Sequence, residues 1–220
     1  MPRAKLKRFD ENKSLPNLLQ EGKEGFDDLK GTWNSAHFKN DLPITIEMGR
    51  GKGEYTIGLA REFKDRNFIG VDIKGDRLWT GSKQAIDENL HQVAFLRTLI
   101  HNIDGFFAPE EIASIWITFP DPRPKDRDIK RRLTSPRFLE MYKTMLNPKG
   151  SVYFKTDNTD LFEYTLEVLN ERKDILDLHF TFDLYASEYV DDHYGIKTNF
   201  EQKYLDLGTK IKYLKFRFAK

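Results

Sequence analysis

The sequence predicts an α/β fold in which helices cover both faces of a mostly parallel sheet, forming a three-layer sandwich. Short runs rich in β-branched and aromatic residues recur along the chain, and helical segments separate the first five of them. The last two runs have no strong helical pattern between them, which favours an antiparallel pair at the end of the chain. We therefore expect seven strands, the last of them antiparallel.

Hydrophobic periodicity and turn residues place the individual elements. Helices are expected at 55–63, at 74–89, after the start signal Thr134-Ser135-Pro136, and around Leu161 and Val168. The expected strands lie at 44–46, 68–71, 93–96, 115–119, 152–154, 179–184 and 211–218. In such sheets ligands bind beyond the carboxyl ends of the strands, so the residues that follow each strand are the candidates for function.

Composition narrows the class of protein. The chain has 220 residues, a net charge of +1 and 39% hydrophobic residues, which predicts one soluble domain over 1–220 with a basic N-terminal extension over about 1–37. No apolar run reaches the roughly 20 residues of a membrane helix and none resembles a secretory signal, so a cytoplasmic location is expected. There is no cysteine, and the five histidines are scattered, so no metal site is expected.

A glycine-rich turn follows the first strand, with glycines at 49, 51 and 53 after Glu47. Glycines allow the backbone to turn sharply and to approach a ligand closely, although a tight turn without a ligand is the alternative. The spacing departs from the dinucleotide fingerprint, which disfavours a dehydrogenase, and no P-loop pattern occurs. Glu47 is placed to face the ammonium group of a bound methionine moiety.

The second strand ends in Asp72, which lies 21 residues beyond Gly51. An acidic side chain at this position can accept hydrogen bonds from both hydroxyls of a ribose, and NAD and S-adenosylmethionine both fit. The alternative is that Asp72 only caps the next turn. Together with the glycine spacing, Asp72 favours the adenosyl sulfonium.

The fourth strand leads into a stiff loop in which prolines at 120, 122 and 124 alternate with other residues and hold Asp121 in place. A rigid connector without function is the alternative. The following segment 123–132, RPKDRDIKRR, has a local excess of four positive charges and indicates contact with nucleic-acid phosphates, unless it is only a solvated face. After the fifth strand, Asp157 is able to accept a hydrogen bond from a base, whereas Asp157, Asn158 or Asp160 is able to cap the next helix.

Five segments together, EMGRGKGEY, FIGVDIK, TFPDPRPKDRDIKRRL, YFKTDNTDLFEYTL and TNFEQKY, resemble the bacterial tRNA (guanine-N7)-methyltransferase family in order and spacing. The resemblance covers about 38–204. It implies a Rossmann-like class I methyltransferase fold, with S-adenosyl-L-methionine as cofactor and tRNA as partner. The implied activity is methyl transfer to N7 of the guanine at position 46 in the variable loop.

The resemblance also implies roles for individual residues. Asp121 is expected to be catalytic, at the junction of cofactor and guanine. The residues expected to contact the cofactor are Glu47, Gly49, Gly51, Asp72, Leu99 and Asp121. Those expected to contact tRNA are Lys125, Arg127, Lys130, Arg131, Arg132, Asp157, Thr198 and Glu201. No membrane or metal is implied, and the protein is expected to be a monomer or a homodimer.

Several positions depart from the family pattern. Arg123 stands where the family has Trp, and Asp128 where His is common. The Asp or Asn expected at Arg97-Thr98-Leu99 is missing, so a backbone carbonyl or Asn102 is expected to contact the adenine amino group instead.

Guanine N7 carries a free lone pair, so its methylation requires alignment and electrostatic stabilisation but no general base. Asp121 or Asp157 is expected to stabilise the positive charge that develops on the purine, and Phe200 or Tyr204 to reach bases. Two other hypotheses are compatible with the sequence. The protein is a methyltransferase for a small molecule or protein, or it is a non-catalytic RNA-binding module.

Overall fold

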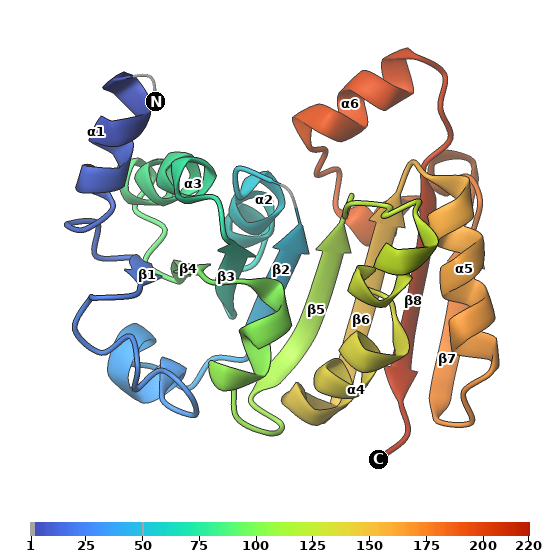
Figure 1. The fold of residues 1–220 in the computed structure, drawn as a ribbon, viewed down its shortest axis with the longest axis horizontal. Helices are drawn as coiled ribbons and strands as arrows, with labels where there is room; N and C mark the ends of the chain where they lie inside the picture. The colour runs from blue at the N-terminus through green and yellow to red at the C-terminus, as the bar shows by residue number, and fades with distance from the viewer. Residues whose placement is uncertain (1–2, 50) are drawn as a thin grey trace.

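A computed structural model describes residues 3–49 and 51–220, and it places eight strands in one sheet of order β1-β4-β3-β2-β5-β6-β8-β7 (Figure 1). Residues 1–2 and Arg50 of the glycine-rich turn lie outside the described residues. The strands are β1 (Leu18–Gln20), β2 (Ile44–Gly49), β3 (Asn67–Asp72), β4 (Val93–Arg97), β5 (Ile112–Thr118), β6 (Leu146–Thr156), β7 (Ile175–Thr181) and β8 (Lys212–Phe218).

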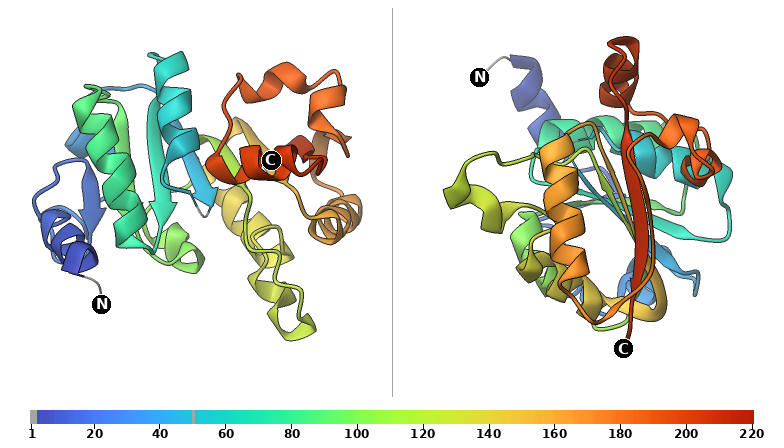
Figure 2. Two further views of the ribbon diagram at one scale, coloured as in Figure 1. Left: turned by 90° about the horizontal axis from the view of Figure 1, so that it is seen from above. Right: turned by 90° about the vertical axis from the view of Figure 1, so that its right-hand side faces the viewer.

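Helices connect most of these strands and cover both faces of the sheet (Figure 2). The α-helices are α1 (Arg3–Glu11), α2 (Glu54–Glu62), α3 (Gly75–Asp87), α4 (Pro136–Met145), α5 (Thr159–Asn170) and α6 (Asn199–Asp206). Shorter helical segments are η1 (Trp33–Phe38), η2 (Ile100–Gly105), η3 (Asp126–Arg131), η4 (Leu184–Ala186) and η5 (Val190–His193). The four helices predicted from periodicity are α2, α3, α4 and α5, and Pro136 begins α4 as expected.

The pairing of the strands confirms the predicted fold class. β1 to β6 pair in parallel, and β8 lies antiparallel between β6 and β7. The sheet has eight strands where seven were predicted. The additional strand, β1, pairs in parallel with β4 and has only three residues, too few for a period-two pattern.

The first third of the chain contributes to the core. Leu18 is fully buried in β1 and Trp33 is fully buried in η1, so most of the segment expected to be a basic extension packs against the sheet. α1 lies against α3, where Trp79 Nε1 donates to Glu11 Oε2 at 2.6 Å and Asn12 Nδ2 donates to the carbonyl of Gly75 at 2.9 Å. These contacts hold the N-terminal segment at the β1 edge of the sheet.

Two hydrophobic clusters, one on each face, bury the sheet. One includes Leu139 of α4 and Phe162 of α5, and the other includes Leu59 of α2 and Leu78 of α3. No helix of residues 3–49 and 51–220 has the length and apolar character needed to cross a membrane.

Candidate active site and nucleic-acid interface

The residues predicted to be functional come together at the carboxyl edge of the sheet, the upper edge in Figure 1. The strands β2 to β6 are parallel, so their carboxyl ends share this edge. Each strand supplies one predicted residue at or just after its end, in the order Glu47, Asp72, Leu99, Asp121 and Asp157.

The three glycines of the glycine-rich turn differ in how much space surrounds them. Packing excludes a side chain at Gly49 and Gly53 but not at Gly51. A Cβ on Gly49 would overlap the carbonyl oxygen of Thr118, and Gly53 has a φ of +77° and no room for a Cβ beside the Phe95 ring. Gly51 differs, because a Cβ there would meet nothing closer than the Gly53 nitrogen at 3.5 Å. The chain itself therefore does not require glycine at 51, whereas a ligand lying against this backbone would.

Glu47 lies inside a small cavity that Gly49, Gly51 and Gly53 also line. Its carboxylate accepts hydrogen bonds from the Thr56 backbone nitrogen and from Thr118 Oγ1, both at 2.8 Å. The side chain is buried, and this burial raises its pKa above the usual carboxyl range despite the hydrogen bonds. A fixed, desolvated carboxylate of this kind suits an ammonium ligand.

Asp72 lies where this cavity meets a second, larger one. Its Oδ1 accepts from the Lys74 backbone nitrogen at 2.9 Å, so the turn-capping alternative is partly realised. Its Oδ2 is buried, accepts no hydrogen bond from the described part of the chain, and lies 3.6 Å from Nη1 of Arg77. Burial raises the pKa of Asp72. The open oxygen is an acceptor suited to a ribose hydroxyl.

The second cavity has an apolar floor and a cationic rim. Leu99, 43% exposed, lies on the floor with Ile100 and Phe138. Arg123, Lys130, Arg131 and Arg137 form the rim. Asn102, expected as a substitute adenine contact, lies in η2 and does not line this cavity, whereas Thr98 does.

The proline-rich loop places Asp121 beside Arg123, which lines the second cavity and begins the basic segment. Phe119 and Arg123, which flank it, both have a φ of +47°, a left-handed conformation that costs about 1–3 kcal/mol in a residue with a side chain. The Arg123 backbone nitrogen lies 3.4 Å from Asp121 Oδ1, and its Nε lies 3.5 Å from Oδ2. Asp121 is thus presented at the edge by a strained and stiff loop.

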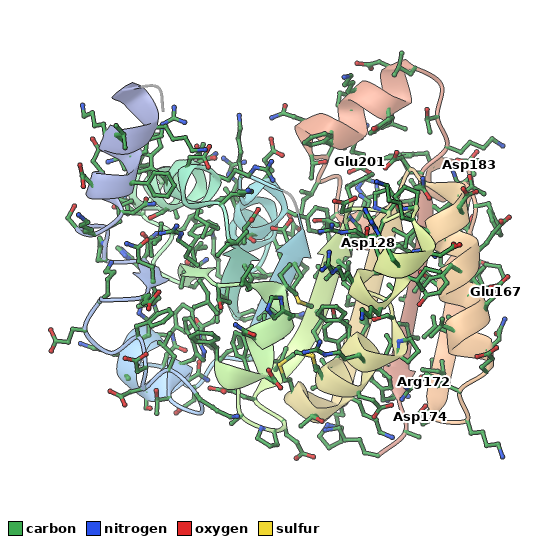
Figure 3. All side chains as sticks on the ribbon, in the orientation of Figure 1. Asp128, Glu167, Arg172, Asp174, Asp183 and Glu201 are labelled. Carbon is green, nitrogen blue, oxygen red and sulfur yellow. The ribbon has the colours of Figure 1, made fainter. Side chains whose placement is uncertain are left out.

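The basic segment divides into exposed and buried cations. Lys125, Arg127, Lys130 and Arg131 are exposed on or beside η3, and Asp128, labelled in Figure 3, accepts from Arg131 at 3.0 Å. Arg132 differs from the prediction, because only 8% of it is exposed. Its Nε donates to the carbonyl of Pro122 at 3.1 Å, and its guanidinium lies 4.3 Å from the Tyr164 ring centre. Arg132 therefore braces the Asp121 loop from inside.

After β6, Asn158 is the residue that caps α5, since its Oδ1 accepts from the Leu161 nitrogen at 2.7 Å. The carboxylate of Asp157 is therefore not used as the cap, and the half-buried residue stays a candidate for contact with a base. Lys212 Nζ donates to the backbone carbonyl of Asp157 at 2.8 Å and holds this turn in place.

Thr198 and Glu201 form the capping box of α6 and are both buried. Glu201 is completely buried, and its Oε1 lies 2.6 Å from Lys155 Nζ and 2.8 Å from the Tyr185 hydroxyl. Glu201 therefore differs from the expectation of a direct tRNA contact. Asn199 and Phe200 of this turn are exposed, and Phe200 has 49% of its surface accessible.

Comparisons with known proteins identify the family of this chain. A family model described as "Putative methyltransferase" matches residues 41–214. The tRNA (guanine-N(7)-)-methyltransferase of Cytophaga hutchinsonii is 48% identical over 99% of both chains, and that of Clostridioides difficile is 36% identical over 95% of both chains. The chain belongs to the tRNA (guanine-N7)-methyltransferase family.

Solved structures share the fold of this tRNA (guanine-N7)-methyltransferase family member. A structure described as an antibiotic-related methyltransferase has a TM-score of 0.60 at 21% identity and covers 83% of this chain and 90% of its own. The 16S rRNA methyltransferase KamB has a TM-score of 0.62 at 12% identity and covers 91% of this chain and 96% of its own. At these identities the likeness shows the Rossmann-like methyltransferase fold.

In this methyltransferase, the sequence analysis missed the part of the site that depends on side chains from distant segments. Lys155 lies within the segment YFKTDNTDLFEYTL, and the sequence alone assigns it no role. The T-x-x-E pattern of residues 198–201 is a capping-box signal and could have identified Thr198 and Glu201 as structural. Within residues 3–49 and 51–220, no group of three or more His, Cys, Asp or Glu side chains is arranged to hold a metal ion.

Proposed function

We propose that this protein transfers a methyl group from S-adenosyl-L-methionine to N7 of guanine in tRNA, and that its target is the guanine at position 46 of the variable loop. The observation that carries the proposal is the continuity of three features along one edge. The glycine-lined cavity and the cation-rimmed cavity share Asp72, and Asp121 pairs with Arg123 on the rim of the second cavity. Relatives that cover nearly the whole chain support the substrate.

The residues at this edge fit the cofactor. The Glu47 carboxylate would pair with the ammonium group, the backbone at Gly49 and Gly51 would lie against the methionine moiety, and the open Oδ2 of Asp72 would accept from a ribose hydroxyl. Leu99 would cover the adenine. When bound, S-adenosyl-L-methionine supplies an electrophilic methyl group on a sulfonium.

The chemical demands on the protein are modest. Guanine N7 is already a nucleophile, so no residue has to remove a proton before the attack. The protein has to hold the base in line and to stabilise the positive charge that spreads over the purine. We assign this role to Asp121, whose loop is fixed by Arg132 and by three prolines, with Asp157 as the second carboxylate at the edge. Stabilisation that grows toward the transition state raises the rate.

The exposed cations of η3 lie beside Asp121 and are suited to the phosphates of the tRNA. N7 of a stacked base is shielded, so the target guanine has to leave its stack before it reaches the edge. Phe200, exposed on the first turn of α6, offers a face on which a base can stack.

The proposal is tested with purified protein, methyl-labelled S-adenosyl-L-methionine and two tRNA transcripts that differ only at position 46, guanine in one and adenine in the other. We expect label in the guanine transcript alone. Label in both transcripts at equal rates would refute the assignment of position 46.

A second function, methylation of a small molecule or a protein, uses the same cofactor half of the site. Cofactor binding without transfer to either transcript would favour it. The cationic rim of the second cavity favours a polyanionic substrate such as tRNA instead. It is formed by Arg123, Lys130, Arg131 and Arg137.

A further inference from the structure

One lysine at the active edge is completely buried. Lys155 lies near the end of β6, its side chain has 0% exposure, and its Nζ lies 2.6 Å from Oε1 of the equally buried Glu201. Glu201 also accepts from the Tyr185 hydroxyl at 2.8 Å, and its Oε2 lies 3.4 Å from the Thr198 nitrogen. A lysine that is fully buried away from solvent requires an oppositely charged partner, because an unpaired buried charge is strongly destabilising.

The ammonium group lies at the meeting point of three elements. It is 5.1 Å from the ring centre of Tyr55, in the first turn of α2 after the glycine-rich turn, and 6.0 Å from that of Phe119, at the start of the Asp121 loop. Through Glu201 it reaches the N-terminus of α6. Lys155 therefore contacts Glu201 of α6 directly and lies close to α2 and to the start of the Asp121 loop.

α6 projects above the sheet (Figure 1). Its half-buried Tyr204 and Leu205 pack against the same hydrophobic cluster as α2, and Glu201 ties its first turn to β6. Most of its residues are exposed, and Leu207, which follows it, has 70% of its surface accessible. Glu201 is its one buried residue. A second tie joins Asn199 to Glu54 of α2, where the Asn199 nitrogen lies 3.3 Å from Glu54 Oε2.

We infer that Lys155 and Glu201 are positioning residues: their buried ion pair sets the first turn of α6, with Phe200, in register with the Asp121 loop so that a tRNA guanine is held in line. This inference rests on the proposed function. Neither residue has to touch tRNA, because the pair acts through the placement of Phe200 and Asp121. A merely structural pair would affect all properties of the enzyme in proportion to stability.

The test compares full-length Lys155→Met with the double variant Lys155→Met/Glu201→Gln, measuring Tm, Kd for S-adenosyl-L-methionine, and KM and kcat for tRNA. In Lys155→Met the buried Glu201 charge loses its partner, so Tm falls, and we expect KM for tRNA to rise about ten-fold or more while the cofactor Kd stays within about two-fold. In the double variant the charge is gone, so Tm recovers, but the link between β6 and α6 is still absent and KM stays high. Recovery of KM together with Tm would overturn the inference, as would an unchanged KM in the single variant.

Arg172→Met supplies a matched control. Arg172 forms ion pairs in which its Nη1 lies 2.5 Å from Glu140 Oε1 and its Nη2 lies 2.6 Å from Asp174 Oδ2. Figure 3 shows Arg172 and Asp174 at the opposite end of the sheet from Glu201. This variant should lower Tm without changing KM for tRNA.

If the wild-type protein methylates no tRNA, the proposed function fails. In that case the inference is tested by the Kd for tRNA, measured by filter binding. This Kd should increase in Lys155→Met and in the double variant, and an unchanged Kd in either would overturn the inference.

Discussion

At the scale of single residues, the glycine-rich turn separates positions that folding requires from a position that ligand binding requires. Gly49 and Gly53 have no room for a side chain, because Thr118 and Phe95 occupy the space. Gly51 has room and an ordinary φ. Its lack of a side chain is therefore best explained by the close approach of the cofactor.

We predict that Gly51→Ala retains the wild-type Tm within about 2 °C and weakens S-adenosyl-L-methionine binding about ten-fold or more, since the new methyl group fills the cavity. Calorimetric titration measures the Kd, and a thermal scan measures Tm. Gly105→Ala is the control, because nothing lies within 4 Å of a Cβ there. Equal cofactor affinity in the two variants would contradict this account of Gly51.

The raised pKa of Glu47 predicts that cofactor binding depends on pH. A raised pKa means that the carboxyl group becomes neutral at a higher pH than an ordinary glutamate, and a neutral group no longer pairs with an ammonium. We expect Kd for S-adenosyl-L-methionine to increase as the pH falls from about 7.5 toward about 5. Glu47→Gln should bind more weakly at pH 7.5 and show a flatter pH profile, and a profile as steep as that of the wild type would assign the effect to another group.

Asp121 is expected to act on the chemical step. Asp121→Ala should reduce the single-turnover rate of methyl transfer about 100-fold, as loss of one electrostatic stabiliser does in other enzymes, at saturating tRNA and cofactor. Rapid-quench measurement of labelled tRNA gives this rate. If Asp121→Ala retains the wild-type rate under these conditions, the stabilising role belongs to Asp157 or to the backbone.

At the scale of elements, η3 and the Asp121 loop are adjacent but differ in their environment. The cations of η3 are exposed, whereas the Asp121 loop is held by a buried arginine. Lys130 is exposed on η3, whereas Arg132 donates inward to the loop that carries Asp121. The same run of basic sequence therefore serves two purposes. Charge counting along the sequence cannot separate them, because the difference lies in which side chain meets Pro122 and Tyr164 after folding.

We predict that Lys130→Ala lowers the slope of log Kd for tRNA against log salt by about one, with cofactor affinity unchanged. Arg132→Met should leave that slope unchanged and lower kcat, because the Asp121 loop loses its brace. Filter binding at several salt concentrations measures the slopes. Equal slopes for wild type and Lys130→Ala would mean that Lys130 contacts no phosphate.

The elements themselves were largely predictable because their signals are local. Strong hydrophobic periodicity identified α2 to α5, and the parallel order followed from the alternation of strands and helices. β1 was missed because three residues carry no period, and α6 because its eight residues carry little apolar pattern. β1 forms a strand because it pairs with β4, whose paired residues lie 77 positions further along the chain.

At the scale of the whole molecule, function depends on where charge lies and not on its total. The net charge is only +1, yet four cations rim one cavity at the active edge. The positions of Glu47, Asp72 and Asp121 were predictable, since each lies near the end of a strand and the carboxyl ends of parallel strands share an edge. The Lys155–Glu201 pair was not, because it joins residues 46 positions apart through a fold that brings them within 2.6 Å.

The most direct test of the central claim is to map the methyl group in natural tRNA. Bulk tRNA without N7-methylguanosine is treated with the protein and S-adenosyl-L-methionine, then reduced and cleaved by chemistry specific for N7-methylguanine, and the fragments are sequenced. The account predicts one new cleavage, at the guanine in position 46 of the variable loop. Cleavage at other guanines, or methylated tRNA that resists cleavage, would contradict it.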